Sequence, residues 1–194
     1  MKADIVLAGV GGQGVLTAAG ILAEAARRAG FTVKQGEVHG MSQRGGAVTA
    51  NLRLADGPVA SDLIPRGSAS MILSLEPLEA LRWLPYLSYS GVVVTSSNPV
   101  ENIPDYPPMA EVLLSLARLP QAVVVDADPL ARAAGSGHAN NVVLLGAAAG
   151  FLPFRPSLLR CVVGELFGMR SERLRDVNLK AFDAGQAAAA VPAG

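Results

Sequence analysis

The sequence predicts an α/β fold, a three-layer α/β/α sandwich built on a mixed, mostly parallel sheet. Apolar runs typical of strands alternate along the chain with segments whose apolar residues recur every three or four positions, as in helices. Most of these strand-like runs are continuously apolar, which is typical of strands covered on both faces. One run instead alternates apolar and polar residues, which favours an antiparallel strand within the sheet.

The composition fits one domain over residues 1–194, without repeats or a dividing linker. Sixteen basic and sixteen acidic residues cancel, and no basic face or tail is visible, so nucleic acid and acidic membranes are poor partners. No apolar run reaches the roughly 18 residues needed to span a membrane, and no signal peptide is visible, so we expect a cytoplasmic protein. Charged residues make up only 16% of the chain, which indicates a large core or a surface covered by a partner.

The first elements are a buried strand, a glycine turn and a helix. Residues 5–8 are all apolar, and apolar residues between 15 and 29 recur at helical spacing until Gly30 stops the helix. Backbone N–H groups at such a turn point outward, and the helix dipole favours negative charge, so the turn predicts an anion site. The turn contains Gly9, Gly11, Gly12, Gln13 and Gly14.

A second strand is expected over 31–38, and the polar, glycine-rich segment 39–46 follows it. Because this segment comes after a strand, we expect it at the same sheet edge as the glycine turn. Arg44 could hold a phosphate or carboxylate in a fork, and His39 could donate a hydrogen bond or carry a proton. An alternative stays open, in which these side chains pair internally or pack against another subunit.

The remaining elements follow in order. Residues 47–54 alternate, so Thr49, Asn51 and Arg53 are expected on the exposed face of a half-buried strand. The segment 99–108 is rich in proline and is expected to be a surface loop. The other expected elements are strands over 69–75, 91–97 and 122–128, and helices that begin near residues 77, 109, 129, 140, 156 and 171.

Several single residues allow more than one interpretation. Gln13 is an amide that a plain phosphate loop does not need, so it could bind ligand. Asp126 and Asp128 end a strand, where an acid/base or metal pair is conceivable but helix capping by Asp128 is favoured. Cys161 is the only cysteine; we expect it to be buried and inert, and alone it cannot hold an iron–sulfur cluster. No complete catalytic or metal-binding set can be assembled from the chain.

The glycines also fit a dinucleotide-binding fingerprint. Gly9, Gly11 and Gly14 have its spacing, and Glu37 beyond the second strand could bind a ribose. A self-sufficient, NAD-binding Rossmann oxidoreductase is therefore the alternative function. The glycine pattern alone is a weak signal, because glycines also serve tight turns and close packing.

Longer motifs resemble one family over about residues 3–185. They are GVGGQGVLTAAGILAEAA, VKQGEVHGMSQRGGAV, IPRG, LSLEPLEALRWLPYLSYSGVVV, NNVVLLGA and NLKAFDAG. They resemble the gamma-type subunits of 2-oxoacid:ferredoxin oxidoreductases, most of all those of the indolepyruvate type. The resemblance implies a Rossmann-like fold similar to domain III of pyruvate:ferredoxin oxidoreductase.

The resemblance also implies a function. Such complexes oxidatively decarboxylate a 2-oxoacid, transfer the acyl group to coenzyme A and reduce ferredoxin. Thiamine diphosphate, magnesium and iron–sulfur clusters are expected on a catalytic partner subunit, and this chain is expected to be accessory and inactive alone. The chain would help to form the coenzyme A and substrate site and the subunit interface. The implied site residues are Gly11, Gly12, Gln13, Gly14, His39, Ser42, Arg44, Gly45 and Gly46. The particular 2-oxoacid, the oligomeric state and whether these loops touch ligand or only a partner stay open.

Overall fold

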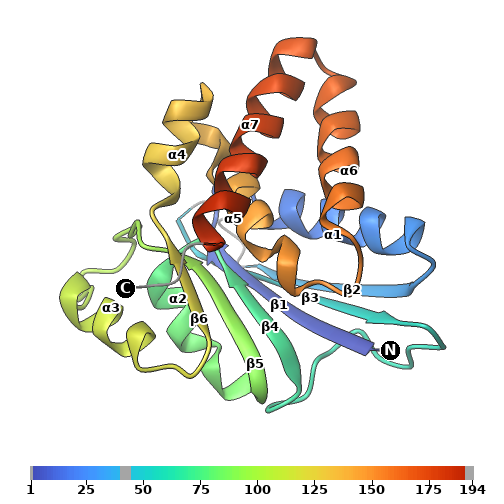
Figure 1. Ribbon diagram of the computed structural model, residues 1–194. Helices are drawn as coiled ribbons and strands as arrows, with labels where there is room; N and C mark the ends of the chain where they lie inside the picture. Colours follow the sequence, from blue (N-terminus) through green and yellow to red (C-terminus); the bar gives the residue numbers. More distant parts are fainter. Residues whose placement is uncertain (1, 40–44, 191–194) are drawn as a thin grey trace.

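The computed structural model describes residues 2–39 and 45–190 and has the three expected layers (Figure 1). The strands are β1 (Lys2–Val10), β2 (Thr32–His39), β3 (Ala47–Ala55), β4 (Ala69–Ser74), β5 (Leu87–Ser96) and β6 (Ala122–Val125). They form one sheet in the order β2-β3-β1-β4-β5-β6. Strand β3 runs antiparallel to both neighbours, and the other neighbouring pairs are parallel. The predicted mixed, mostly parallel sheet is therefore confirmed.

Two layers of helices cover the sheet (Figure 1). The helices are α1 (Val15–Arg28), α2 (Pro77–Arg82), α3 (Met109–Ala117), α4 (Ala127–Ala134), α5 (Asn140–Ala148), α6 (Pro156–Gly168) and α7 (Glu172–Ala189). Helices α1, α5, α6 and α7 pack on one face, where Ile5 and Leu7 of β1 point. Helices α2 and α3 pack on the other face, where Val6 points. The continuously apolar run of β1 is thus buried on both faces, as its sequence predicts.

Helices α5 and α7 cross with their backbones almost in contact. A Cβ atom added at Gly146 would overlap the carbonyl of Phe182, and one at Gly185 would overlap the carbonyl of Val143. Nearly all of α5 is buried as a result. The two glycines permit this approach, because any side chain there would force the helices apart.

The polar face of β3 is buried, which contradicts the expectation of a half-exposed strand. Arg53 Nε donates to Asp4 Oδ1 at 2.9 Å, and Arg53 Nη1 donates to the carbonyls of Ser61 and Leu63 at 3.1 and 2.9 Å. Asp4 is 2% exposed. The connection between β3 and β4 therefore lies over this face, and the strand pattern could not reveal that cover because it comes from residues outside the strand.

Cys161 lies exposed on α6, so the expectation of a buried thiol was wrong. The buried face of the helix is formed by Leu159, Val162 and Val163, and Cys161 points away from it. Its Sγ donates to Glu165 Oε1 at 3.2 Å. This hydrogen bond to a carboxylate, with a smaller contribution from desolvation, raises the pKa of the Cys161 thiol.

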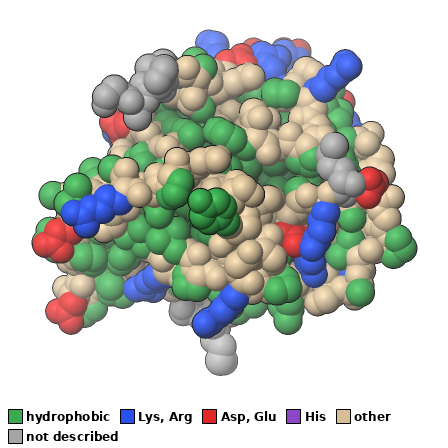
Figure 2. Space-filling view, turned by 60° about the horizontal axis from the view of Figure 1, so that its bottom comes forward, with side chains coloured by type: hydrophobic (Ala, Val, Ile, Leu, Met, Phe, Trp, Pro, Cys, Tyr) green, Lys and Arg blue, Asp and Glu red, His purple; other side chains and the backbone are tan. Residues whose placement is uncertain are grey.

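The surface reflects the low content of charged residues. Figure 2 shows the molecule turned from the view of Figure 1, and hydrophobic side chains occupy more of this face than charged ones. Exposed large apolar side chains include Leu63, Tyr89 and Leu114. None of the helices in the described ranges combines the length and apolar character needed to cross a bilayer.

The crossing of α5 and α7 predicts opposite effects for two Gly→Ala substitutions. Gly185→Ala is expected to lower the free energy of unfolding by roughly 2–3 kcal/mol, because its methyl group has no space. Gly20→Ala, in the interior of α1 with open space around it, is expected to raise that free energy by about 0.5–1 kcal/mol. Denaturant unfolding measures both, and equal stability of the two variants would contradict the close crossing.

The Cys161–Glu165 hydrogen bond predicts that Glu165→Gln speeds thiol alkylation. Without the carboxylate, the pKa of Cys161 falls towards its ordinary value, so more thiolate is present at pH 8. We expect about a twofold or greater rise in the alkylation rate, measured by mass spectrometry. The control Glu111→Gln, on α3, should leave the rate unchanged. A slower reaction of Glu165→Gln would contradict the conclusion that the hydrogen bond to Glu165 raises the pKa of the Cys161 thiol.

Candidate functional site at the carboxyl edge of the sheet

The topology opens a crevice at the carboxyl ends of β1 and β4. From β1 the chain crosses through α1 towards β2 on one side, while β4 lies on the other side. Ligands of open α/β sheets bind at such a switch point. A cleft of about 380 Å³ lies there. Its lining includes Gly12, Gly14, Asn98, His138, Asn141 and Arg170.

The glycine turn keeps the start of α1 accessible. Gly14 is the N-cap of α1 with a φ of 88°, a left-handed conformation that favours glycine, and no side chain caps the helix. Gly12 also has a positive φ, 106°, and its Cα faces open space. The start of α1 therefore lies beside the cleft, and no side chain caps its first N–H groups, an arrangement suited to an anion.

Gln13 ties the turn to the sheet. Its Oε1 accepts from the backbone N–H of Val10 at 2.7 Å, and its Nε2 donates to the carbonyl of Leu75 at 3.0 Å. These two bonds join the ends of β1 and β4 across the crevice. The amide that the sequence suggested as a possible ligand group thus holds the turn together, while Gln13 still lines the cleft.

The two ends of the 39–46 segment that the structure describes meet the rest of this edge as expected. The backbone of His39 pairs with Val48, and the N–H of Gly11 donates to the carbonyl of Gly46 at 2.8 Å. The N–H of Gly45 in turn donates to the carbonyl of Gly11 at 3.4 Å. The predicted proximity of the glycine turn and this segment is therefore confirmed. Ser42 and Arg44 lie outside the described residues.

Asn98 organises the polar floor of the cleft. Its Oδ1 accepts from the backbone N–H of Asp128 at 2.9 Å, and its Nδ2 donates to Asp126 Oδ1 at 2.8 Å. Asp128 Oδ1 also accepts from Asn140 Nδ2 at 3.3 Å. The predicted cap by Asp128 was wrong, because α4 starts at Ala127 and Asp126 occupies the N-cap position. The side chain of Asn98, from another strand end, satisfies the helix start instead.

Two basic side chains lie at the rim of the cleft. His138 and Arg170 are both exposed and line it, and within the described ranges neither side chain has a hydrogen-bond or ion-pair partner. No local motif marks Arg170 as a site residue, since it follows α6 in a part of the chain far from the glycine motifs. No group of three or more His, Cys, Asp or Glu side chains that could hold a metal ion lies within the described part of the chain.

The NAD-binding alternative is not favoured by this geometry. A dinucleotide fold places the second strand beside the first, so that its acidic residue reaches the ribose. Here β3 lies between β1 and β2. Glu37 on β2 is therefore two strands away from the glycine turn, and its Oε1 accepts from Gln35 Nε2 at 2.7 Å.

Fold and cleft together define a class of α/β proteins in which a glycine turn and an inserted antiparallel strand meet at the carboxyl edge of the sheet. The model of the pyruvate ferredoxin/flavodoxin oxidoreductase family matches residues 4–188, and the chain belongs to this family.

Individual relatives narrow the comparison. The chain is 41% identical to indolepyruvate oxidoreductase subunit IorB of Pyrococcus horikoshii, over 96% of this chain and 95% of the relative. It resembles the gamma subunit of keto/oxoacid ferredoxin oxidoreductase from Geobacter sulfurreducens, with a TM-score of 0.73, 25% identity and 97% coverage of both chains. It also shares its fold with part of 2-oxoglutarate:ferredoxin oxidoreductase from Magnetococcus marinus, with a TM-score of 0.75 and 21% identity. That match covers 97% of this chain and 31% of the other.

The bonds of Gln13 predict a specific cost for Gln13→Glu. The carboxylate keeps the acceptor for Val10 but loses the donor to Leu75 and faces its carbonyl oxygen instead. We expect the free energy of unfolding to fall by roughly 1–2 kcal/mol. The matched control is Gln121→Glu, at an exposed position before β6, where the change should stay within about 0.5 kcal/mol. Equal stability of both variants would show that the two hydrogen bonds of the Gln13 side chain contribute little to stability.

Proposed function

We propose that this chain is the accessory subunit of a cytoplasmic, indolepyruvate-type 2-oxoacid:ferredoxin oxidoreductase. The observation that carries the proposal is the identity of 41% to a subunit of indolepyruvate oxidoreductase across nearly the whole of both chains. The family match over residues 4–188 supports it. The complete enzyme would oxidatively decarboxylate a 2-oxoacid, transfer the acyl group to coenzyme A and reduce ferredoxin.

The proposal places the cofactors on a catalytic partner subunit. Thiamine diphosphate, magnesium and iron–sulfur clusters would be held there. The chemistry of this chain supports that division, because iron–sulfur clusters need several thiolates and the chain has one cysteine. The chain also lacks the GDG motif that is typical of thiamine diphosphate sites.

We propose that the carboxyl edge of the sheet faces coenzyme A and the catalytic partner subunit. Coenzyme A carries phosphate groups, and the start of α1, His138 and Arg170 offer N–H groups and basic side chains to an anion. The solved Magnetococcus enzyme that shares the fold holds coenzyme A. A cleft of about 380 Å³ lies near the lower end of ligand sites, about 300–1,000 Å³, so it would hold only part of so large a molecule. The rest would lie against the glycine turn, the 39–46 segment and the partner.

The residues assigned to this side are those of the two loops. The backbone of the turn would bind anionic groups, Arg44 would bind a phosphate or carboxylate, and His39 and Ser42 would donate hydrogen bonds. The set is Gly11, Gly12, Gln13, Gly14, His39, Ser42, Arg44, Gly45 and Gly46.

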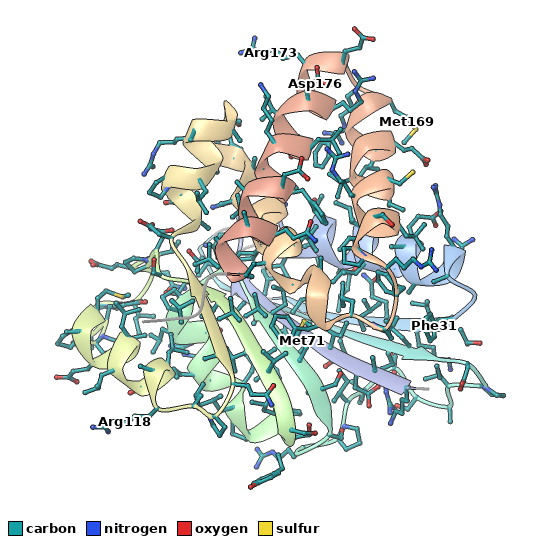
Figure 3. The ribbon with its side chains drawn as sticks, viewed as in Figure 1. Phe31, Met71, Arg118, Met169, Arg173 and Asp176 are labelled. Atoms are coloured by element: carbon teal, nitrogen blue, oxygen red, sulfur yellow. The ribbon has the colours of Figure 1, made fainter. Side chains whose placement is uncertain are left out.

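This proposal predicts that the co-expressed complex is active while the isolated chain shows no turnover. In the complex, Arg44→Ala and Arg170→Ala should each raise the KM for coenzyme A by about five- to tenfold, as expected for the loss of a charge-assisted contact. The control is Arg118→Ala, which removes a side chain that points away from the body of the protein at the end of α3 (Figure 3). Steady-state kinetics measures all three.

Two outcomes would contradict the proposal. Turnover by the isolated chain would show that no catalytic partner is needed. An unchanged KM for coenzyme A in both test variants would leave the chain as a scaffold without a part in coenzyme A binding.

A further inference from the structure

Residues 97–108 form a strap between β5 and α3. The connection is long for one without helix or strand, and such connections are usually functional or disordered. Four prolines limit its freedom. The proline-rich sequence predicted only a surface loop here, but three side chains of the strap bond to segments that are distant in sequence.

The first attachment lies where the strap leaves β5. Asn98 bonds to Asp126 and to the backbone of Asp128, which fixes the start of the strap to the start of α4. The next two residues, Pro99 and Val100, form part of the wall of the cleft. The position of the strap therefore decides the width of the cleft on this side.

The second attachment reaches the 39–46 segment. Asn102 Nδ2 donates to the carbonyl of Gly45 at 2.9 Å, across 57 positions of sequence. Gly45 is itself bonded to Gly11, and Gly11 is bonded to Gly46. A continuous path of hydrogen bonds thus runs from the strap through Gly45 to the glycine turn.

The third attachment fastens the far end of the strap. The hydroxyl of Tyr106 donates a short hydrogen bond to Glu76 Oε1. Glu76 is 1% exposed, and its Oε2 accepts from the N–H of Glu79 at 2.8 Å, which caps α2. Both carboxyl oxygens are used, so removal of the Tyr106 hydroxyl would leave a buried oxygen of Glu76 without this partner. Burial and the bond to Glu76 raise the pKa of Tyr106, so the hydroxyl keeps its proton at neutral pH.

We propose that Asn102 and Tyr106 are positioning residues, which hold the strap so that it fixes Gly45 against the glycine turn and closes one wall of the cleft. Neither side chain lines the cleft. Asn102 bonds to the carbonyl of Gly45. Asn102 and Tyr106 together set the positions of Pro99 and Val100, which line the cleft. The mechanical part of this inference rests on the bonds above, and its consequence for coenzyme A rests on the proposed function.

Amide hydrogen exchange of the full chain, followed by NMR, tests the mechanical part. Asn102→Ala and Tyr106→Phe should each speed exchange at Gly11 and Gly45 by about three- to tenfold, the effect of losing one hydrogen bond. Exchange in β4 should not change. The control Ser115→Ala removes a hydroxyl that donates to the Glu111 carbonyl on α3 at 2.8 Å, and should leave Gly11 and Gly45 as they are.

The possible outcomes distinguish failure of the inference about the strap from failure of the proposed function. Faster exchange confined to the strap itself, or no change in Asn102→Ala, would overturn the inference; Asn102→Ala serves as the deciding variant if Tyr106→Phe folds poorly. In the active complex, Asn102→Ala should raise the KM for coenzyme A several-fold with a smaller change in kcat. Faster exchange at Gly11 and Gly45 with an unchanged KM would support the strap and contradict the assignment of this edge to coenzyme A.

Discussion

Strand β3 pairs antiparallel with β1, and this pairing fixes the position of everything at the carboxyl edge. Its register places Arg53 opposite Asp4 at one end and Ala47 opposite Val10 at the other. The buried ion pair is strongly oriented, because Arg53 also binds two carbonyls of the covering connection. A slip of one residue would turn these side chains to the opposite face. Because the register holds, Gly46 arrives beside Gly11, and the two glycine-rich loops become one surface.

The same pairing explains why a dinucleotide motif does not make a dinucleotide site here. Inserting β3 moves β2 to the edge of the sheet and takes Glu37 away from the turn. The start of α1 keeps its uncapped N–H groups, and the cleft beside it is bounded by residues from the connection after β5, from α4, from α5 and from the end of α6. The result is an anion-suited cleft whose other walls come from distant parts of the chain. Such a cleft suits a subunit that completes a site together with a partner.

Local patterns in the sequence were enough to predict most of the fold. The apolar run of β1, the glycine turn and the helical spacing of α1 each report on their own neighbourhood, and the alternation of β3 identified the antiparallel strand. The errors had different causes: the connection after β3 covers Arg53, Cys161 lies on the outward side of its helix, and Asn98 instead of Asp128 bonds to the start of α4. At the site, the proximity of the two loops followed from topology, whereas Arg170 and the bonds of Asn102 and Tyr106 depend on packing between segments far apart in sequence.

We propose that the carboxyl edge of this subunit faces coenzyme A at the boundary with a catalytic partner. A cryo-electron microscopy structure of the assembled complex with coenzyme A bound is the decisive test. We expect density for an anionic group of coenzyme A against the glycine turn, within reach of Arg170, with the partner covering the 39–46 segment. A complex in which this edge faces solvent, and in which coenzyme A lies wholly within the partner, would contradict it.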